Sequence, residues 1–229
     1  MHFLISKKAR TIIGWTPKCG CTHIKHLYYY LENGAVLDHT KLHTLGNHKL
    51  PGRYRYYKII LITRNPFKRL ISGFLDKYAP GRGFYGQLPE GDSLTFTNFV
   101  DKLMDLTPTT HSVNYHHFIH QSGVEFNDII LKHHNLVVMD LENIDYSLLG
   151  ACWGKVIPNE IINYRGPHER CKIPLNEVVF DEGTIPNLPI KDYYQSKVSM
   201  DLFYNESIKQ KVINFYKKDF ELFYPNLII

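Results

Sequence analysis

The sequence predicts an α/β fold in three layers, with a central, mostly parallel sheet flanked by helices. Two segments, Thr11–Trp15 and residues 57–63, are short apolar runs rich in isoleucine and without polar alternation. Such runs are typical of strands that are buried on both faces of a parallel sheet. A turn and then a stretch with helical spacing follow each run, and strand–turn–helix units in series favour parallel pairing.

The remaining elements are expected from weaker patterns. Residues 135–139 (NLVVM) predict a third strand, and helices are expected at residues 22–31, 66–78 and 143–149. Apolar residues at helical spacing over residues 207–223 predict one packing helix. The Gly- and Pro-containing stretches connect these elements as loops, at residues 34–54 and 79–93, with an irregular, lid-like segment at about 154–190.

Length and composition indicate one globular domain, residues 1–229. Apolar residues make up 44% of the 229 residues and charged residues 21%, which excludes a disordered or fibrous chain. The net charge of +5 suggests an anionic ligand. The four cysteines, at positions 19, 21, 152 and 171, form no CxxC pair, so neither a disulfide scaffold nor a zinc ribbon is expected.

The N-terminal segment does not resemble a secretory signal. Lys7, Lys8 and Arg10 occupy positions where a signal peptide would need its apolar stretch. The longest apolar runs are far shorter than the roughly 18–20 residues that span a membrane. We therefore expect a cytoplasmic location and no membrane span.

The first strand–helix turn has the composition of an anion-binding loop. Residues 15–25 read WTPKCGCTHIK and combine Lys18, the permissive Gly20 and the hydroxyl of Thr22. A helix N-terminus presents unpaired N–H groups and a partial positive charge, so it binds phosphate or sulfate readily. The Walker A pattern GxxxxGK(S/T) is absent, so the loop differs from that of an ordinary nucleoside triphosphatase.

The second turn, residues 61–72, reads LITRNPFKRLIS. Asn65 can cap the following helix, and a proline suits the first helical position. Arg64 then stands at the carboxyl end of the strongest predicted strand, where ligands bind in open α/β sheets, while Arg69 and Ser72 follow on the helix. Two anion sites at two strand ends suit a ligand with two separated anionic groups.

Together the two turns resemble the two cofactor motifs of the Golgi-type (membrane-bound class) sulfotransferases, a family that includes the carbohydrate sulfotransferases. The segments PKCGCTHIK and TRNPFKRLISGF carry the resemblance, and the second matches RxPxxRxxS at every fixed position. Residues 216–223 are also similar to the family's C-terminal helix. The resemblance implies a P-loop-like fold and transfer of a sulfuryl group from 3′-phosphoadenosine 5′-phosphosulfate (PAPS) to an acceptor hydroxyl, on a carbohydrate or a small alcohol or phenol, without a metal.

The resemblance assigns the first motif to the 5′-phosphosulfate. Lys18 would contact the oxygen that bridges phosphate and sulfate and neutralise the charge that develops as that bond breaks. The backbone N–H groups of Cys19, Gly20, Cys21 and Thr22, together with the Thr22 hydroxyl, would hold the 5′-phosphate. We interpret the two cysteines as small neutral fillers, not as nucleophiles or ligands.

The second motif is assigned in the same way to the 3′-phosphate. The resemblance implies that Arg64 and Ser72 clamp this group. Arg69 would either help to bind it or brace the loop that does. The adenosine 3′,5′-bisphosphate product would keep the same contacts.

Transfer to a hydroxyl benefits from a general base within reach of the acceptor, often histidine or glutamate. Some members of the family place a catalytic histidine between the two cofactor motifs. His43, followed by His39, most resembles that arrangement. The rival cluster is NYHHFIH, in which His116 and His120 are four apart and could share a helix face; with His117 they either contact an acceptor or are partly buried surface residues.

Two other functions stay open. A nucleotide-dependent kinase on the related P-loop scaffold would bind similar phosphates, and a non-enzymatic polyanion-binding protein would use the same positive charge. The basic residues are dispersed and no RNA-binding motif is present, so no nucleic-acid partner is expected.

Overall fold

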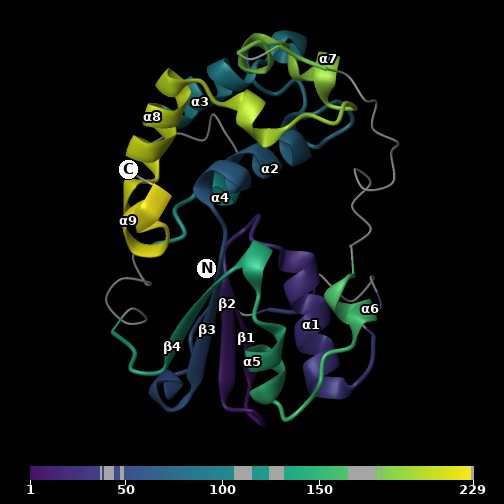
Figure 1. Ribbon diagram of the computed structural model, residues 1–229, viewed down its shortest axis with the longest axis vertical. Helices are drawn as coiled ribbons and strands as arrows, with labels where there is room; N and C mark the ends of the chain where they lie inside the picture. The colour runs from purple at the N-terminus through teal and green to yellow at the C-terminus, as the bar shows by residue number, and fades with distance from the viewer. Residues whose placement is uncertain are drawn as a thin grey trace. The chain divides into compact units, whose positions relative to one another are not determined.

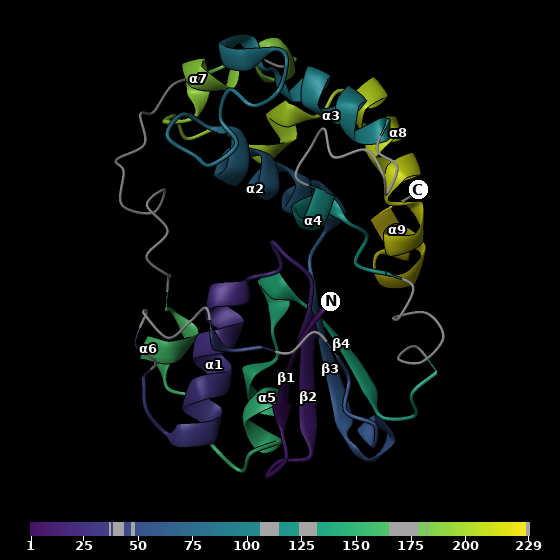
Figure 2. The same ribbon diagram turned by 180° about the vertical axis from the view of Figure 1, so that it is seen from behind.

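Figure 1 shows the protein as a computed structural model, and Figure 2 shows it from behind. The structure describes residues 1–36, 38, 44–46, 49–105, 115–123, 132–164, 179–181 and 183–227. The chain divides into two compact units. The first unit comprises residues 1–64 and 121–168, and the second comprises residues 65–120 and 169–229.

The first unit is built on a four-stranded, mostly parallel sheet, which confirms the α/β fold class. The strands are β1 (His2–Ser6), β2 (Thr11–Trp15), β3 (Lys58–Thr63) and β4 (Leu136–Asp140), in the order β1-β2-β3-β4. β2, β3 and β4 pair in parallel and correspond to the three predicted strands. Parallel pairing brings the carboxyl ends of these three strands to one edge of the sheet.

β1 was not predicted from the sequence. It pairs antiparallel with β2 through a tight turn in which Arg10 has a positive φ of 47°. The Ser6 hydroxyl accepts a hydrogen bond from the Ala9 N–H at 2.9 Å and closes that turn. The stretch HFLIS has only one β-branched residue, whereas TIIGW of β2 has three, so its own sequence marks it less clearly as a strand.

Three helices lie on one side of this sheet, and the last of them packs against the first (Figures 1 and 2). They are α1 (Cys21–Asn33), α5 (Tyr146–Ala151) and α6 (Asn159–Ile162). Their apolar side chains form one core with strand residues that point to the same side, among them Ile13, Ile60 and Ile62. The alternate strand residues Ile12 and Ile59 are fully buried as well, as expected for central strands of a parallel sheet.

The second unit is helical. Its helices are α2 (Pro66–Tyr78), α3 (Phe96–Met104), α4 (Tyr115–Phe118), α7 (Ile190–Tyr193), α8 (Glu206–Phe215) and α9 (Lys217–Phe223). They surround a core rich in aromatic side chains. Gly73 of α2 allows close packing here, because a Cβ at this position would lie only 2.5 Å from the Phe118 ring. α2 begins as predicted, with the Asn65 side chain accepting from the Phe67 N–H at 2.9 Å.

The prediction of one C-terminal helix over residues 207–223 was wrong, because this segment forms two helices. α8 ends at Phe215 and α9 begins at Lys217, with Tyr216 between them in a non-helical conformation. The Tyr216 hydroxyl donates to the backbone carbonyl of Phe118 at 2.8 Å, so the break is held by a buried hydrogen bond.

The other helix predictions hold with shifted ends. The helix expected at 22–31 is α1, and the one expected at 143–149 is a short 3-10 turn, Leu141–Asn143, followed by α5. α3 was not predicted. Of the expected lid, residues 165–178 and 182 lie outside the described residues. Within the described part of the chain, no helix has the length and apolar character needed to cross a membrane.

Candidate functional site

The first turn connects β2 to α1 and has an unusual backbone. Lys18 and Gly20 both have positive φ, 69° and 75°, on either side of Cys19. For a lysine this conformation costs about 1–2 kcal/mol, so other contacts must stabilise it. Alternating backbone handedness of this kind is typical of anion-binding turns. Of the N–H groups predicted to bind the 5′-phosphate, that of Cys19 donates to the Thr16 carbonyl at 3.2 Å. Gly20 is also the N-cap of α1 and gives no side-chain cap, so no cap side chain occupies this helix N-terminus.

Gln121 holds the two turns together. Its Oε1 accepts from the Arg64 backbone N–H at 2.8 Å and from the Cys19 thiol at 3.0 Å. Its Nε2 donates to the Arg64 carbonyl at 2.8 Å. Gln121 is 2% exposed and Cys19 is fully buried, so these bonds are shielded from water. Gln121 was not predicted as a site residue.

Arg64 lies beside the first turn. Its Nη1 donates to the Lys18 carbonyl oxygen at 3.3 Å, and its Nε donates to Glu142 Oε1 at 2.9 Å. The Arg64 side chain keeps 17% of its surface exposed. The structure therefore brings together Lys18 and Arg64, the two cations that were predicted on separate turns.

Glu142 is the second residue of this edge that the sequence analysis did not identify. It lies two residues after the end of β4, and Asp140 Oδ1 accepts its backbone N–H at 3.1 Å. Burial raises the pKa of the Glu142 carboxyl, and a side-chain hydrogen bond with Asp140 raises it further, while the Arg64 charge acts in the opposite direction. The available signal was DLEN, an acidic pair at the end of a predicted strand.

With this geometry established, comparison with known proteins identifies the class of protein. The sequence profile of the sulfotransferase family matches residues 1–136, which include both turns. The chain belongs to the sulfotransferase family.

Two relatives of this sulfotransferase are named carbohydrate sulfotransferase 14. The protein from Mus musculus is 25% identical over 155 residues, and the one from Homo sapiens is 23% identical over 157 residues. Each match covers 55% of this chain and 41% of the relative, so the chain spans less than half of the relatives' length. No solved structure matches it.

The rest of the second sulfotransferase motif belongs to the helical unit. Arg69 is 1% exposed; its Nη2 donates to the His117 carbonyl at 3.4 Å, and its guanidinium lies 5.9 Å from the centre of the Tyr216 ring. These contacts connect α2 with α4 and with the α8–α9 junction. Arg69 was predicted to help bind the 3′-phosphate or to brace the loop that binds it, and its role stays a prediction. Ser72 lies on α2 and is half-buried.

The predicted catalytic base, His43, and its alternative, His39, lie outside the described residues. The rival cluster does not share a helix face as predicted, because α4 ends at Phe118 and His120 follows it. The His120 ring stacks on Phe215 with centroids 5.0 Å apart. Burial lowers the pKa of His120, so this histidine is mainly neutral and packed.

Proposed function

We propose that this sulfotransferase transfers a sulfuryl group from PAPS to a hydroxyl of a carbohydrate acceptor. The observation that supports the proposal most is the pair of turns joined by Gln121. It places the Lys18 carbonyl 3.3 Å from Arg64 Nη1, at the edge where parallel α/β sheets bind ligands. The names of the two relatives support a carbohydrate rather than a small phenol or alcohol.

The residues of the first turn suit a phosphosulfate. The uncapped N-terminus of α1 and the left-handed backbone at Gly20 offer N–H groups for the 5′-phosphate, with the Thr22 hydroxyl beside them. Lys18 would donate to the bridging oxygen and stabilise the negative charge that develops there. When bound, PAPS supplies the activated sulfuryl group. These side chains position it for in-line attack by the acceptor oxygen.

Arg64 would bind the 3′-phosphate, as the family resemblance implies. An arginine can donate two parallel hydrogen bonds to one phosphate, which fixes its orientation as well as its charge. His43 would accept the proton of the acceptor hydroxyl. A cytoplasmic location and a single domain over residues 1–229 also remain predictions from the sequence.

The test is titration calorimetry with adenosine 3′,5′-bisphosphate, the product that keeps the phosphate contacts. Arg64→Ala removes charge-assisted hydrogen bonds, so we expect binding roughly ten- to a hundredfold weaker than that of the wild type. Lys209→Ala, which removes an exposed cation of α8, is the matched control and should bind normally. Unchanged binding after Arg64→Ala contradicts the proposal, and magnesium-dependent turnover of ATP would support a kinase instead.

A further inference from the structure

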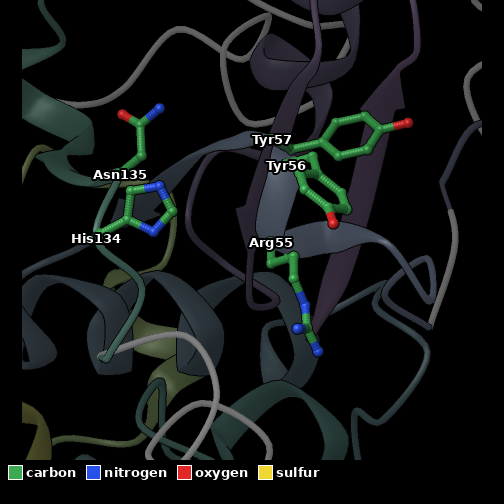
Figure 3. Close-up of a pocket in the computed structure, with 5 residues that line it drawn as sticks. All are labelled: Arg55, Tyr56, Tyr57, His134 and Asn135. Carbon is green, nitrogen blue, oxygen red and sulfur yellow. The ribbon is translucent and has the colours of Figure 1, made fainter.

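A cavity of about 510 Å³ lies at the edge of the sheet opposite the two turns. It is lined by Arg55, Tyr56, Tyr57, His134 and Asn135. Figure 3 shows that these side chains come from two segments, one leading into β3 and the other into β4. β3 runs from Lys58 to Thr63, so the strand separates this cavity from the Arg64 turn by roughly 17 Å.

Cations gather along the same edge. They come from the β1–β2 turn, the segment before β3, the first residue of β3 and the segment before β4: Lys7, Lys8, Arg10, Arg53, Arg55, Lys58 and Lys132. Hydrogen bonds hold these segments together, because the Lys58 N–H donates to the Arg10 carbonyl and the Ile59 N–H to the Asn135 carbonyl, each at 2.9 Å. Residues 1–64 as a whole contain eleven Lys and Arg but only two Asp and Glu.

None of these seven cations forms an ion pair with a carboxylate of the described residues. Elsewhere the chain does pair its lysines, for example Lys102 with Glu90 at 2.9 Å. Like charges that lie close together repel each other, which destabilises the folded chain. An anionic ligand would relieve that repulsion.

The lining of the cavity also offers a tyrosine ring and a side-chain amide, which a simple inorganic anion does not need for binding. Tyr56 leaves 69% of its surface exposed, and its ring offers a flat apolar face for a sugar ring. Arg55 is exposed and can bind a carboxylate or sulfate through two parallel hydrogen bonds, while the exposed Asn135 amide can both donate to and accept from hydroxyls. Single-stranded nucleic acid is usually held by several aromatic platforms for successive bases. Of the two tyrosines that line the cavity, Tyr56 is exposed and Tyr57 is half-buried.

We propose that this edge is a second binding site, which holds the acidic part of a glycan chain. The proposal rests on the proposed function for the carbohydrate nature of the ligand, and it adds that the acceptor chain is a polyanion. The carboxyl edge of the sheet would then bind the donor. The amino edge, formed by Arg55, Tyr56 and the cations around them, would bind carboxylates or sulfates of the acceptor.

The test uses calorimetry with a size-defined heparin oligosaccharide in the absence of nucleotide, with neutral dextran as the uncharged comparison. We expect saturable, salt-sensitive binding of heparin and none of dextran. Arg55→Gln and Tyr56→Ser should each weaken heparin binding about fivefold or more, whereas Lys209→Gln on α8 should leave it unchanged. Both residues are exposed, so the variants should fold normally, which their thermal unfolding curves will show.

Two further results separate this proposal from the proposed function. Adenosine 3′,5′-bisphosphate should bind to Arg55→Gln as tightly as to the wild type, and Arg64→Ala should keep its heparin affinity. Equal heparin binding by Arg55→Gln and the wild type overturns the second site. It is also overturned if single-stranded DNA of equal charge binds as tightly as heparin and loses as much affinity in both variants.

Discussion

The two edges of the sheet in the first unit hold positive charge in opposite ways. At the carboxyl edge, Arg64 is fixed by hydrogen bonds to Glu142 and to the Lys18 carbonyl, and its backbone is held by the buried Gln121. At the amino edge, Arg55 and its neighbouring cations form no ion pair with a described carboxylate, and all of them except the half-buried Lys58 are exposed.

This difference separates two kinds of anion recognition. A fixed arrangement loses little entropy on binding and can stabilise charge that appears only in a transition state. Exposed cations on flexible side chains instead accommodate chains of variable charge pattern, and their contribution falls as salt screens it. The carboxyl edge therefore suits one small ligand in one orientation, and the amino edge suits a polymer.

The largest expected effect is on turnover, from Lys18→Ala. Removal of one preorganised donor to a developing negative charge typically lowers turnover by about 10²- to 10³-fold. The measurement is transfer from labelled PAPS to a panel of glycan and phenolic acceptors. Heparin binding at the amino edge should not change. A variant with near-normal turnover would show that this lysine is not at the reacting centre.

An intermediate effect, on both stability and bisphosphate affinity, is expected from Gln121→Leu. This change removes the acceptor of the partly buried Arg64 N–H and the donor to the Arg64 carbonyl, while the Cys19 thiol keeps its contact with the Thr16 hydroxyl at 3.3 Å. An unsatisfied buried group costs roughly 1–3 kcal/mol. The free energy of unfolding in urea should fall by about 2–3 kcal/mol. Adenosine 3′,5′-bisphosphate should bind roughly tenfold more weakly, since both turns lose their common anchor.

Gln87→Leu is the matched control for that change. Gln87 is exposed and its side-chain amide donates to the nearby Gly83 carbonyl, so the loss of this amide should alter stability by less than about 0.5 kcal/mol. If the two variants lost the same stability, the buried bonds of Gln121 would have no special role in holding the turns.

The smallest effect is expected from Glu142→Gln. Unlike the two substitutions above, this one should strengthen a function, the binding of the bisphosphate. Ionised Glu142 competes with a phosphate for Arg64, so its neutralisation should tighten bisphosphate binding about two- to fivefold at pH 7.5, within the range of a surface ion pair. Because the pKa of Glu142 is raised, the wild-type carboxyl becomes protonated at a higher pH than an ordinary glutamate. The difference between wild type and variant should therefore shrink as the pH falls.

That experiment compares the two proteins at each pH, because the phosphates themselves titrate near pH 6 and affect both equally. Weaker binding by Glu142→Gln at pH 7.5 would mean that Glu142 orients Arg64 for its ligand instead of competing with that ligand.

The turns could be predicted from local sequence signals, whereas contacts between residues far apart in the sequence could not. Lys18, Gly20 and Asn65 act on backbone within a few residues of themselves, so their types alone indicated a loop and a helix start. Gln121 acts on Arg64 and Cys19, which are 57 and 102 residues away, and nothing in its own neighbourhood marks it.

Contacts between residues far apart in the sequence also explain why the family resemblance left the role of Arg69 open. A motif gives the type of residue at Arg69, but its burial beneath Tyr216 depends on helices about 150 residues further along the chain. Likewise, β1 is defined by its pairing with β2 and not by its own five residues. The fold class and the turns were thus accessible from the sequence, whereas the contacts that fix them required the structure.

The buried thiol of Cys19 has a further consequence, for chemical reactivity. It is fully buried, whereas Cys21, two residues later, is partly exposed. A thiol reagent or oxidant would therefore reach Cys21 directly and Cys19 only when the turn opens. The rate at which Cys19 is alkylated then reports how often the donor loop comes apart, and a bound ligand that stabilises the closed loop would protect it.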